Sequence, residues 1–292
     1  MPRSKQKARA APQAAEDQLV QACRDNQLDQ VKSLLESGVS PNAMSQGHHA
    51  LQWAVMREGD AAQHLECAET LLAARADAQS SSHFADLGVD LTPLMHACWS
   101  GDEAVVELLM RHSVDEGGLM KLPSQPSMGS PFTPLMLACV ASQPGCVSAL
   151  IPKIESTSAL DVAITTVGVP LHAHTALWIA LRTALGHRFE LGRMGHQDVS
   201  DAASARACEC AKLIFKRWHE LAPSENVSSA TAHLEMLLFC CLGQSSDEGA
   251  PTQPLSKDEL LRRRLALLDA LVDDHTTGLD VNACLPRPSD IE

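Results

Sequence analysis

The sequence has very few aromatic residues. Only 3% of its 292 residues are Phe, Trp or Tyr, and Tyr is absent, although 45% of the residues are hydrophobic. Aromatic side chains usually supply much of the buried area of a globular core. Their scarcity favours a fold whose core is a thin layer of Leu, Ala, Val and Cys.

Long apolar runs are missing as well. The longest apolar stretches, such as 234–242, are too short to cross a bilayer, so the sequence predicts no membrane span. The N-terminus is basic, with Arg3, Lys5, Lys7 and Arg9, but no apolar run follows these residues. It therefore lacks the pattern of a signal peptide, and we predict a disordered basic tail over residues 1–16.

Positive charge is also in short supply, because the formal net charge is −13. Broad nucleic-acid surfaces are basic, so nucleic acid is not an expected partner. The acidic balance instead favours a protein partner that presents a basic patch. None of the ten Cys residues forms a CxxC pair. Without a secretory signal, free thiols and a cytoplasmic or nuclear location are the simpler interpretation.

Catalytic motifs are not found either. The sequence contains no GxSxG, P-loop or HExxH pattern. The strongest metal candidate combines His172 and His174, with His187 and His196 downstream, and the pair Cys208 and Cys210. However, residues two apart on a helix point to different sides, which argues against the two Cys acting together. We predict no metal, no cofactor and no enzymatic activity; a metal-dependent hydrolase built on these groups is the alternative.

What the sequence does contain is a repeated pattern of short apolar helices. A Leu and an Ala three residues apart share a helical face, and a second apolar cluster follows each pair. A tight turn separates the two helices, at Gly101 in one unit and at Asn26 in another. The pairs are Leu19/Ala22, Leu51/Ala54, Leu94/Ala97, Leu135/Ala138, Leu177/Ala180 and, in weaker form, Leu234/Leu237.

Two of these units carry a specific resemblance. "TPLMHACWSGDEAVVELLM" (92–110) and "TPLMLACVASQPGCVSALI" (133–151) resemble ankyrin repeats, whose T-P-L-H-x-A opening they match except at the His. The resemblance implies an all-α helix–turn–helix solenoid with long inter-unit loops and two units carrying insertions. Six units are expected over 17–283, followed by a tail at 284–292; the units lie near 17–47, 48–90, 91–131, 132–173, 174–230 and 231–283.

The chain departs from the family pattern in two respects. Met95, Met136 and Trp178 replace the motif His, so the usual His-to-Thr hydrogen bond is expected to be absent. The spacing between successive Leu residues is 32, 43, 41, 42 and 57, against about 33 in the family. Insertions at 182–205 and 243–264 leave the repeat register open over 174–283.

The resemblance also implies a function. Ankyrin solenoids bind partner proteins on a concave face, so we expect a non-enzymatic scaffold or adaptor. The alternative is a regulatory or substrate-recognition module of a larger enzyme assembly, such as a ubiquitin ligase. The exposed end of each first helix lies two and three residues after the motif Ala. The expected partner-binding residues at these positions are Arg24, Asp25, Arg57, Trp99, Ser100 and Arg182.

Three of the four Trp residues differ in their expected environment. Trp99 is the strongest binding candidate, because Trp and Arg dominate binding hot spots. The alternative is that Trp99 packs against Met56 or Val140 of a neighbouring unit. Trp53 and Trp178 lie deeper in their motifs and are expected in the core.

Overall fold

The structure is a computed structural model that describes residues 3–56, 61–84, 89–112, 132–156, 160, 175–186, 200–221 and 262. The chain divides into two compact units. The described residues up to Ala138 belong to unit 1, and those from Cys139 onward belong to unit 2. The division falls inside helix α8 (Pro134–Val140). None of the helices in the described ranges is long and apolar enough to cross a membrane.

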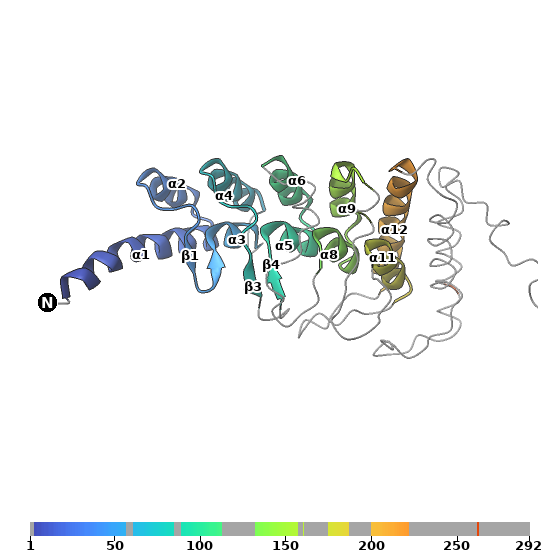
Figure 1. The fold of residues 1–292 in the computed structure, drawn as a ribbon, viewed down its shortest axis with the longest axis horizontal. Coiled ribbons are helices and arrows are strands. Elements are labelled where there is room, and N and C mark those ends of the chain that lie inside the picture. Colours follow the sequence, from blue (N-terminus) through green and yellow to red (C-terminus); the bar gives the residue numbers. More distant parts are fainter. Residues whose placement is uncertain are drawn as a thin grey trace, which may run out of the picture. The chain divides into compact units, whose positions relative to one another are not determined.

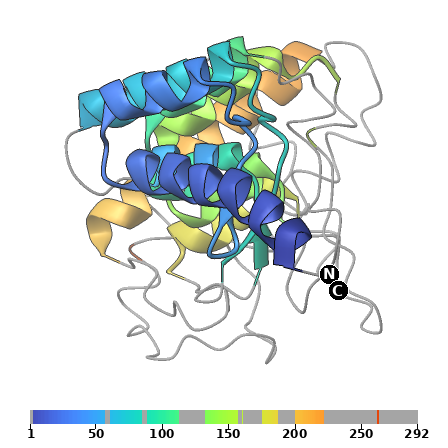
Figure 2. The ribbon, with the colours of Figure 1, turned by 90° about the vertical axis from the view of Figure 1, so that its left-hand side faces the viewer.

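Unit 1 contains three consecutive helix pairs. They are α1 (Arg3–Arg24) with α2 (Leu28–Glu36), α3 (Ala50–Val55) with α4 (Ala61–Ala73), and α5 (Pro93–Ser100) with α6 (Glu103–Arg111). The first helices contact one another in one row and the second helices contact one another in another (Figure 1). Turned by 90°, the molecule shows α2 lying above α1 (Figure 2). Each pair therefore buries its apolar face against its partner and its neighbours.

The repeated Leu–Ala pairs form the core, as the sequence predicted. In all five pairs that the structure describes, both side chains are buried. The turns are also confirmed, because Gly101 has φ 80° and Asn26 has φ 61°. These left-handed angles end one helix and redirect the chain into the next. Ser142 takes the same conformation, with φ 55°, in the turn after α8.

The helix starts are fixed by threonine caps. Thr92 Oγ1 accepts a hydrogen bond from the Met95 N–H at 3.3 Å, and Pro93 occupies the first turn of α5. Thr133 Oγ1 likewise accepts from the Met136 N–H at 3.2 Å, and Met136 Sδ accepts from the Thr133 N–H at 3.5 Å. The methionine at the motif His position therefore returns a hydrogen bond to its Thr through sulfur.

The links after the first two pairs form short antiparallel hairpins, which the sequence did not predict. The strands are β1 (Met44–Ser45) with β2 (His48–His49), and β3 (Ser82–Phe84) with β4 (Val89–Leu91). Gln46 and Gly47 both have positive φ, as a two-residue hairpin turn of this kind requires. In Figure 1 the hairpins project from the row of first helices.

One buried and one exposed hydrogen bond join one repeat of unit 1 to the next. Gln52 is fully buried in α3, and its Nε2 donates to the Leu91 carbonyl of β4 at 2.8 Å. Asn42 Oδ1 accepts from the Asp77 N–H at 2.7 Å, which ties the first link to the second. These bonds set the register between neighbouring hairpins.

The N-terminal segment differs from the prediction of a disordered tail. Helix α1 begins at Arg3 and continues without a break to Arg24. The physical reason lies in its composition, since Ala, Lys, Arg and Gln all have high helix propensity and fill most of residues 3–16. The segment therefore extends the first helix of unit 1 toward the N-terminus.

Unit 2 is built around one long helix. α12 (Asp201–Leu221) packs against α11 (Ala176–Ala184), α9 (Pro144–Leu150) and the 3₁₀ turn η1 (Ile151–Lys153). Arg217 Nε and Nη2 donate to the Ile154 carbonyl at 3.1 and 2.8 Å, and Arg206 Nε donates to the Ser142 carbonyl at 3.2 Å. The insertion between α11 and α12 does not prevent these helices from pairing. Apart from Arg262, the sixth expected unit lies outside the described residues.

Candidate functional site

Four ring-bearing side chains form a continuous strip on unit 1, which we call the aromatic strip: Trp53, His48, Phe84 and His96. The centroid of the His48 ring lies 5.1 Å from that of Trp53 and 4.9 Å from that of Phe84. The Phe84 and His96 centroids are 5.3 Å apart. All four residues are half-buried, and they come from α3, β2, β3 and α5. The strip therefore joins the first helices to the hairpins of two repeats.

Arg24 and Asp25 lie at one end of the aromatic strip. The Arg24 guanidinium carbon is 4.8 Å from the centroid of the Trp53 ring, and Arg24 itself is exposed at the end of α1. Asp25 is also exposed and accepts a hydrogen bond from Gln21 Nε2 at 2.8 Å. No carboxylate in the described part of the chain lies within ion-pair distance of Arg24. Its stacking on Trp53 is therefore an exposed cation–π contact.

Trp99 and Ser100 lie at the other end. They follow His96 on α5 by three and four residues, so they share its side of the helix. Trp99 is half-buried and Ser100 is exposed, with its Oγ donating to the Ala97 carbonyl at 3.2 Å. Four sequence-predicted positions thus lie at the two ends of the same row of rings: Arg24, Asp25, Trp99 and Ser100. Together with the strip they define what we call the hairpin face of unit 1.

The surroundings of the two imidazoles in the strip favour their neutral form. Burial lowers the pKa of His48, and the nearby His83 and His49 lower it further. Burial, followed by the influence of His48, lowers the pKa of His96 to about 4. The Nδ1 atoms of His48 and His96 are buried without a hydrogen-bond partner among the described residues. Protonation would therefore bury an unpaired N–H, which explains the direction of both shifts.

Polar contacts hold the hairpins that carry the strip. His83 Nδ1 and Asp90 Oδ1, which pair across the β3–β4 hairpin, are 2.8 Å apart. The His49 N–H donates to Ser82 Oγ at 3.3 Å and so links the two hairpins. Although four histidines gather here, no three His, Cys, Asp or Glu side chains within the described ranges are placed to hold a metal ion.

The other predicted residues lie elsewhere. Arg57 falls outside the described residues. Arg182 belongs to unit 2, where its guanidinium carbon lies 5.3 Å from the centroid of the Trp178 ring. The prediction that Trp53 and Trp178 are core residues is wrong, because both are half-buried and each has an Arg stacked on its ring. They follow the buried Leu of their motifs by two and one residues, which turns their side chains away from the buried face.

Sequence reasoning missed three members of the strip: His48, Phe84 and His96. Most of their ring contacts join residues that are far apart in the sequence, so no local pattern predicts them. A weaker signal was present, because the chain has only nine aromatic residues and three of them, Trp53, Phe84 and Trp99, lie on this face.

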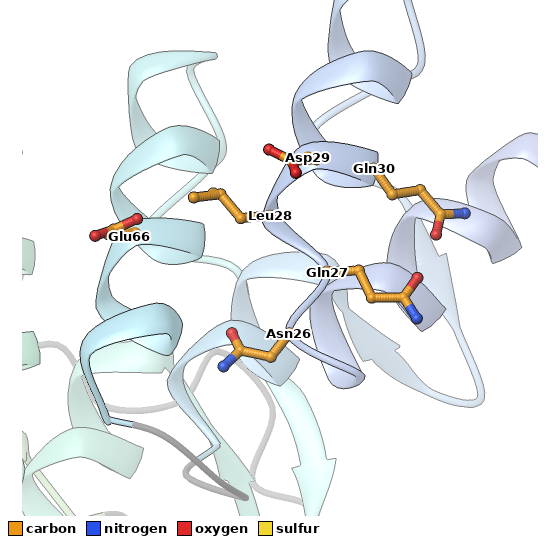
Figure 3. Close-up of a pocket in the computed structure, with 6 residues that line it drawn as sticks. All are labelled: Asn26, Gln27, Leu28, Asp29, Gln30 and Glu66. Atoms are coloured by element: carbon orange, nitrogen blue, oxygen red, sulfur yellow. The ribbon is translucent and has the colours of Figure 1, made fainter.

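A second surface feature lies at the start of α2. An open cavity there has a volume of about 610 Å³. Its lining residues, drawn in Figure 3, are Asn26, Gln27, Leu28, Asp29, Gln30 and Glu66. Leu28 points toward the helix that carries Glu66, whereas Gln27 and Gln30 point away (Figure 3). The Cys67 thiol donates to Asn26 Oδ1 at 3.5 Å. Five of its six lining residues are polar, whereas ligand pockets are lined mainly by apolar side chains, so this cavity is a weaker candidate than the hairpin face.

Comparison with known proteins agrees with the repeats seen in the fold. A family model described as ankyrin repeats (3 copies) matches residues 19–117 and 61–158. Among solved structures, the chain is similar to "EF0377 an Ankyrin Repeat Protein", with 18% identity and a TM-score of 0.46 over 68% of this chain and 80% of that chain. No curated protein matches the sequence. The residues matched by the family model include the whole aromatic strip.

Proposed function

Since this chain is an ankyrin-repeat protein, we propose that it acts as a non-enzymatic scaffold or adaptor that binds a partner protein on the hairpin face of unit 1. The observation that carries the proposal is the aromatic strip, flanked by Arg24 and Trp99. Half-exposed Trp rings are typical of binding hot spots. Covering these rings on binding would remove apolar surface from water without requiring a deep pocket.

The charge distribution supports a partner that presents a basic patch. The net charge is −13, and the second helices of unit 1 carry most of their exposed charge as carboxylates. Their exposed charged residues are Asp29, Lys32, Glu36, Glu66, Glu69, Glu103, Glu107 and Arg111. Such a field attracts positively charged partners over distances comparable to the Debye length.

The cysteines support a cytoplasmic or nuclear setting. The cysteines that the structure describes are free thiols, and most of them are buried. Burial raises the pKa of both Cys23 and Cys67, so these thiols stay protonated and behave as small apolar side chains. A reducing compartment keeps such residues in this form.

The experiment is affinity capture from a cell extract with wild-type chain and a Trp99→Ala variant, read by mass spectrometry. The matched control is Glu69→Ala, which changes an exposed residue on α4 in the other row of helices. Circular dichroism establishes that all three proteins are equally helical. The proposal expects at least one protein to be captured by wild type and by Glu69→Ala, and lost with Trp99→Ala.

Equal capture by all three proteins would contradict binding at the hairpin face. The alternative, a recognition module of a larger enzyme assembly, uses the same face. The identity of the captured protein separates the two: an enzyme subunit supports the alternative, and a non-enzymatic partner supports the scaffold.

A further inference from the structure

One end of the aromatic strip already holds a cation. The exposed Arg24 places its guanidinium 4.8 Å from the Trp53 ring centroid, within the range of a cation–π interaction. The same arrangement occurs independently in unit 2, where Arg182 stacks on Trp178 at 5.3 Å. The half-buried Trp rings of this chain therefore offer faces that accept a guanidinium.

The contact between Arg24 and Trp53 is weak enough to be replaced. An exposed cation–π pair is a weak interaction, and it strengthens when a bound partner removes water from around it. No ion pair among the described residues holds Arg24 in place. A cation delivered by a partner that also excludes water would bind the same ring more strongly than Arg24 does.

The rest of the strip suits a cation and not an anion. His48 and His96 lie in the same row of rings and their surroundings favour the neutral form, which does not repel a positive charge. The chain as a whole carries a net charge of −13, which attracts cations and opposes an acidic partner. Among the described residues, Arg24 is the cation that contacts Trp53, and the exposed Asp25 follows it in the chain.

We propose that the aromatic strip binds an arginine or lysine side chain of the partner protein, which displaces Arg24 from the face of Trp53. This inference rests on the proposed function, because it names the chemistry that the hairpin face recognises. It makes Arg24 an internal occupant of the site that competes with the partner.

The test measures binding of a fluorescein-labelled peptide of alternating Arg and Ser by anisotropy, using the full chain. The key pair of variants is Arg24→Ala and Lys32→Ala. Both residues are exposed and each change removes one positive charge, but only Arg24 covers Trp53. The expected result is that Arg24→Ala raises the affinity about two- to fivefold more than Lys32→Ala does. An equal or smaller increase would overturn the proposal.

A second variant removes the ring itself. Trp53→Leu is expected to lower the affinity for the Arg–Ser peptide about three- to tenfold, while Trp53→Phe retains part of it. Glu–Ser and Gln–Ser peptides should bind less tightly than the Arg–Ser peptide to the wild-type chain. If Trp53→Leu is as helical as wild type and binds the peptide equally well, or if the Glu–Ser peptide binds best, the inference fails.

These measurements do not require the natural partner. Suppose that a partner is captured through Trp99, that Arg24→Ala does not change its binding, and that the chain shows no preference for the Arg–Ser peptide. The proposed function would then stand, and this inference would be rejected. Loss of partner capture altogether would remove the proposed function while the peptide titration still reports on the Trp53 site.

Discussion

Arg75 shows how a single residue stores strain in this fold. It follows α4 with φ 66°, a left-handed conformation that costs an L-residue roughly 1–2 kcal/mol. Gly38, at the corresponding position after α2, adopts φ 90° without that cost. The chain therefore has glycine at this position in one repeat and a strained residue with a side chain in the next.

Arg75→Gly should stabilise the protein. Relief of the left-handed strain, partly offset by the greater chain entropy of glycine when unfolded, gives an expected gain of about 0.5–1 kcal/mol in the free energy of unfolding. Urea denaturation measures it. Arg75→Ala is the control, because it removes the same exposed charge but keeps the Cβ and should leave stability unchanged. A similar gain in both variants would show that charge and not backbone conformation is responsible.

His96 links stability to pH. Its pKa is lowered to about 4 in the folded chain, against a value near 6.5 when unfolded. Between these values the unfolded chain binds more protons, so the contribution of His96 is fully present above about pH 6.5 and is lost as the pH falls toward 4. The lowered pKa of His48 acts in the same direction.

When the pH is lowered from 7 to 4, we expect the free energy of unfolding to fall further in wild type than in His96→Leu. The difference between the two decreases should be on the order of 2 kcal/mol. Urea denaturation of both proteins at several pH values measures the difference. The comparison isolates His96, because all other titrating groups are common to both proteins. Parallel pH profiles would mean that the imidazole of His96 titrates normally in the folded state.

At the scale of elements, helix starts and turns were predictable because their signals are local. Thr92 and Pro93 define the start of α5 within two residues, and Gly101 defines its end. The hairpins were not predictable, since strands of two or three residues are too short to show an alternating pattern. Bonds that anchor them, such as that between Gln52 and Leu91, join residues 39 positions apart and leave no local signal in the sequence.

The same distinction explains the site. The ends of the hairpin face, at Arg24 and Trp99, could be placed because each follows its motif Ala by two residues. The middle of the face could not, because Phe84 reaches His48 and His96 only after two hairpins have formed. The extension of α1 to Arg3 was missed because its basic composition was interpreted as a tail, although the same residues favour a helix.

Gln52 is the most direct test of coupling between neighbouring repeats. Gln52→Ala removes the buried donor to the Leu91 carbonyl and leaves that carbonyl unpaired, which should cost about 1–3 kcal/mol. Thermal unfolding measures the loss. Gln21→Ala is the control, because Gln21 is exposed and makes its hydrogen bond within a single helix turn. Equal effects of the two changes would show that the bond between repeats contributes nothing beyond helix propensity.

At the scale of the whole molecule, different features of the chain attract a partner from a distance and recognise it on contact. The net charge of −13 acts at long range and favours positively charged partners, whereas the aromatic strip acts only on contact. The exposed carboxylates of α2, α4 and α6 lie on helices of the other row. High salt should therefore slow association with a basic partner more than it speeds dissociation.

The central claim is that a partner protein binds the hairpin face, and amide hydrogen exchange of the chain alone and in complex with its captured partner tests it most directly. The account predicts slower exchange in the complex at residues 44–49, 82–84 and 96–101, with little change in α2, α4 and α6. Protection confined to these second helices, with unchanged exchange in the hairpins, would contradict it.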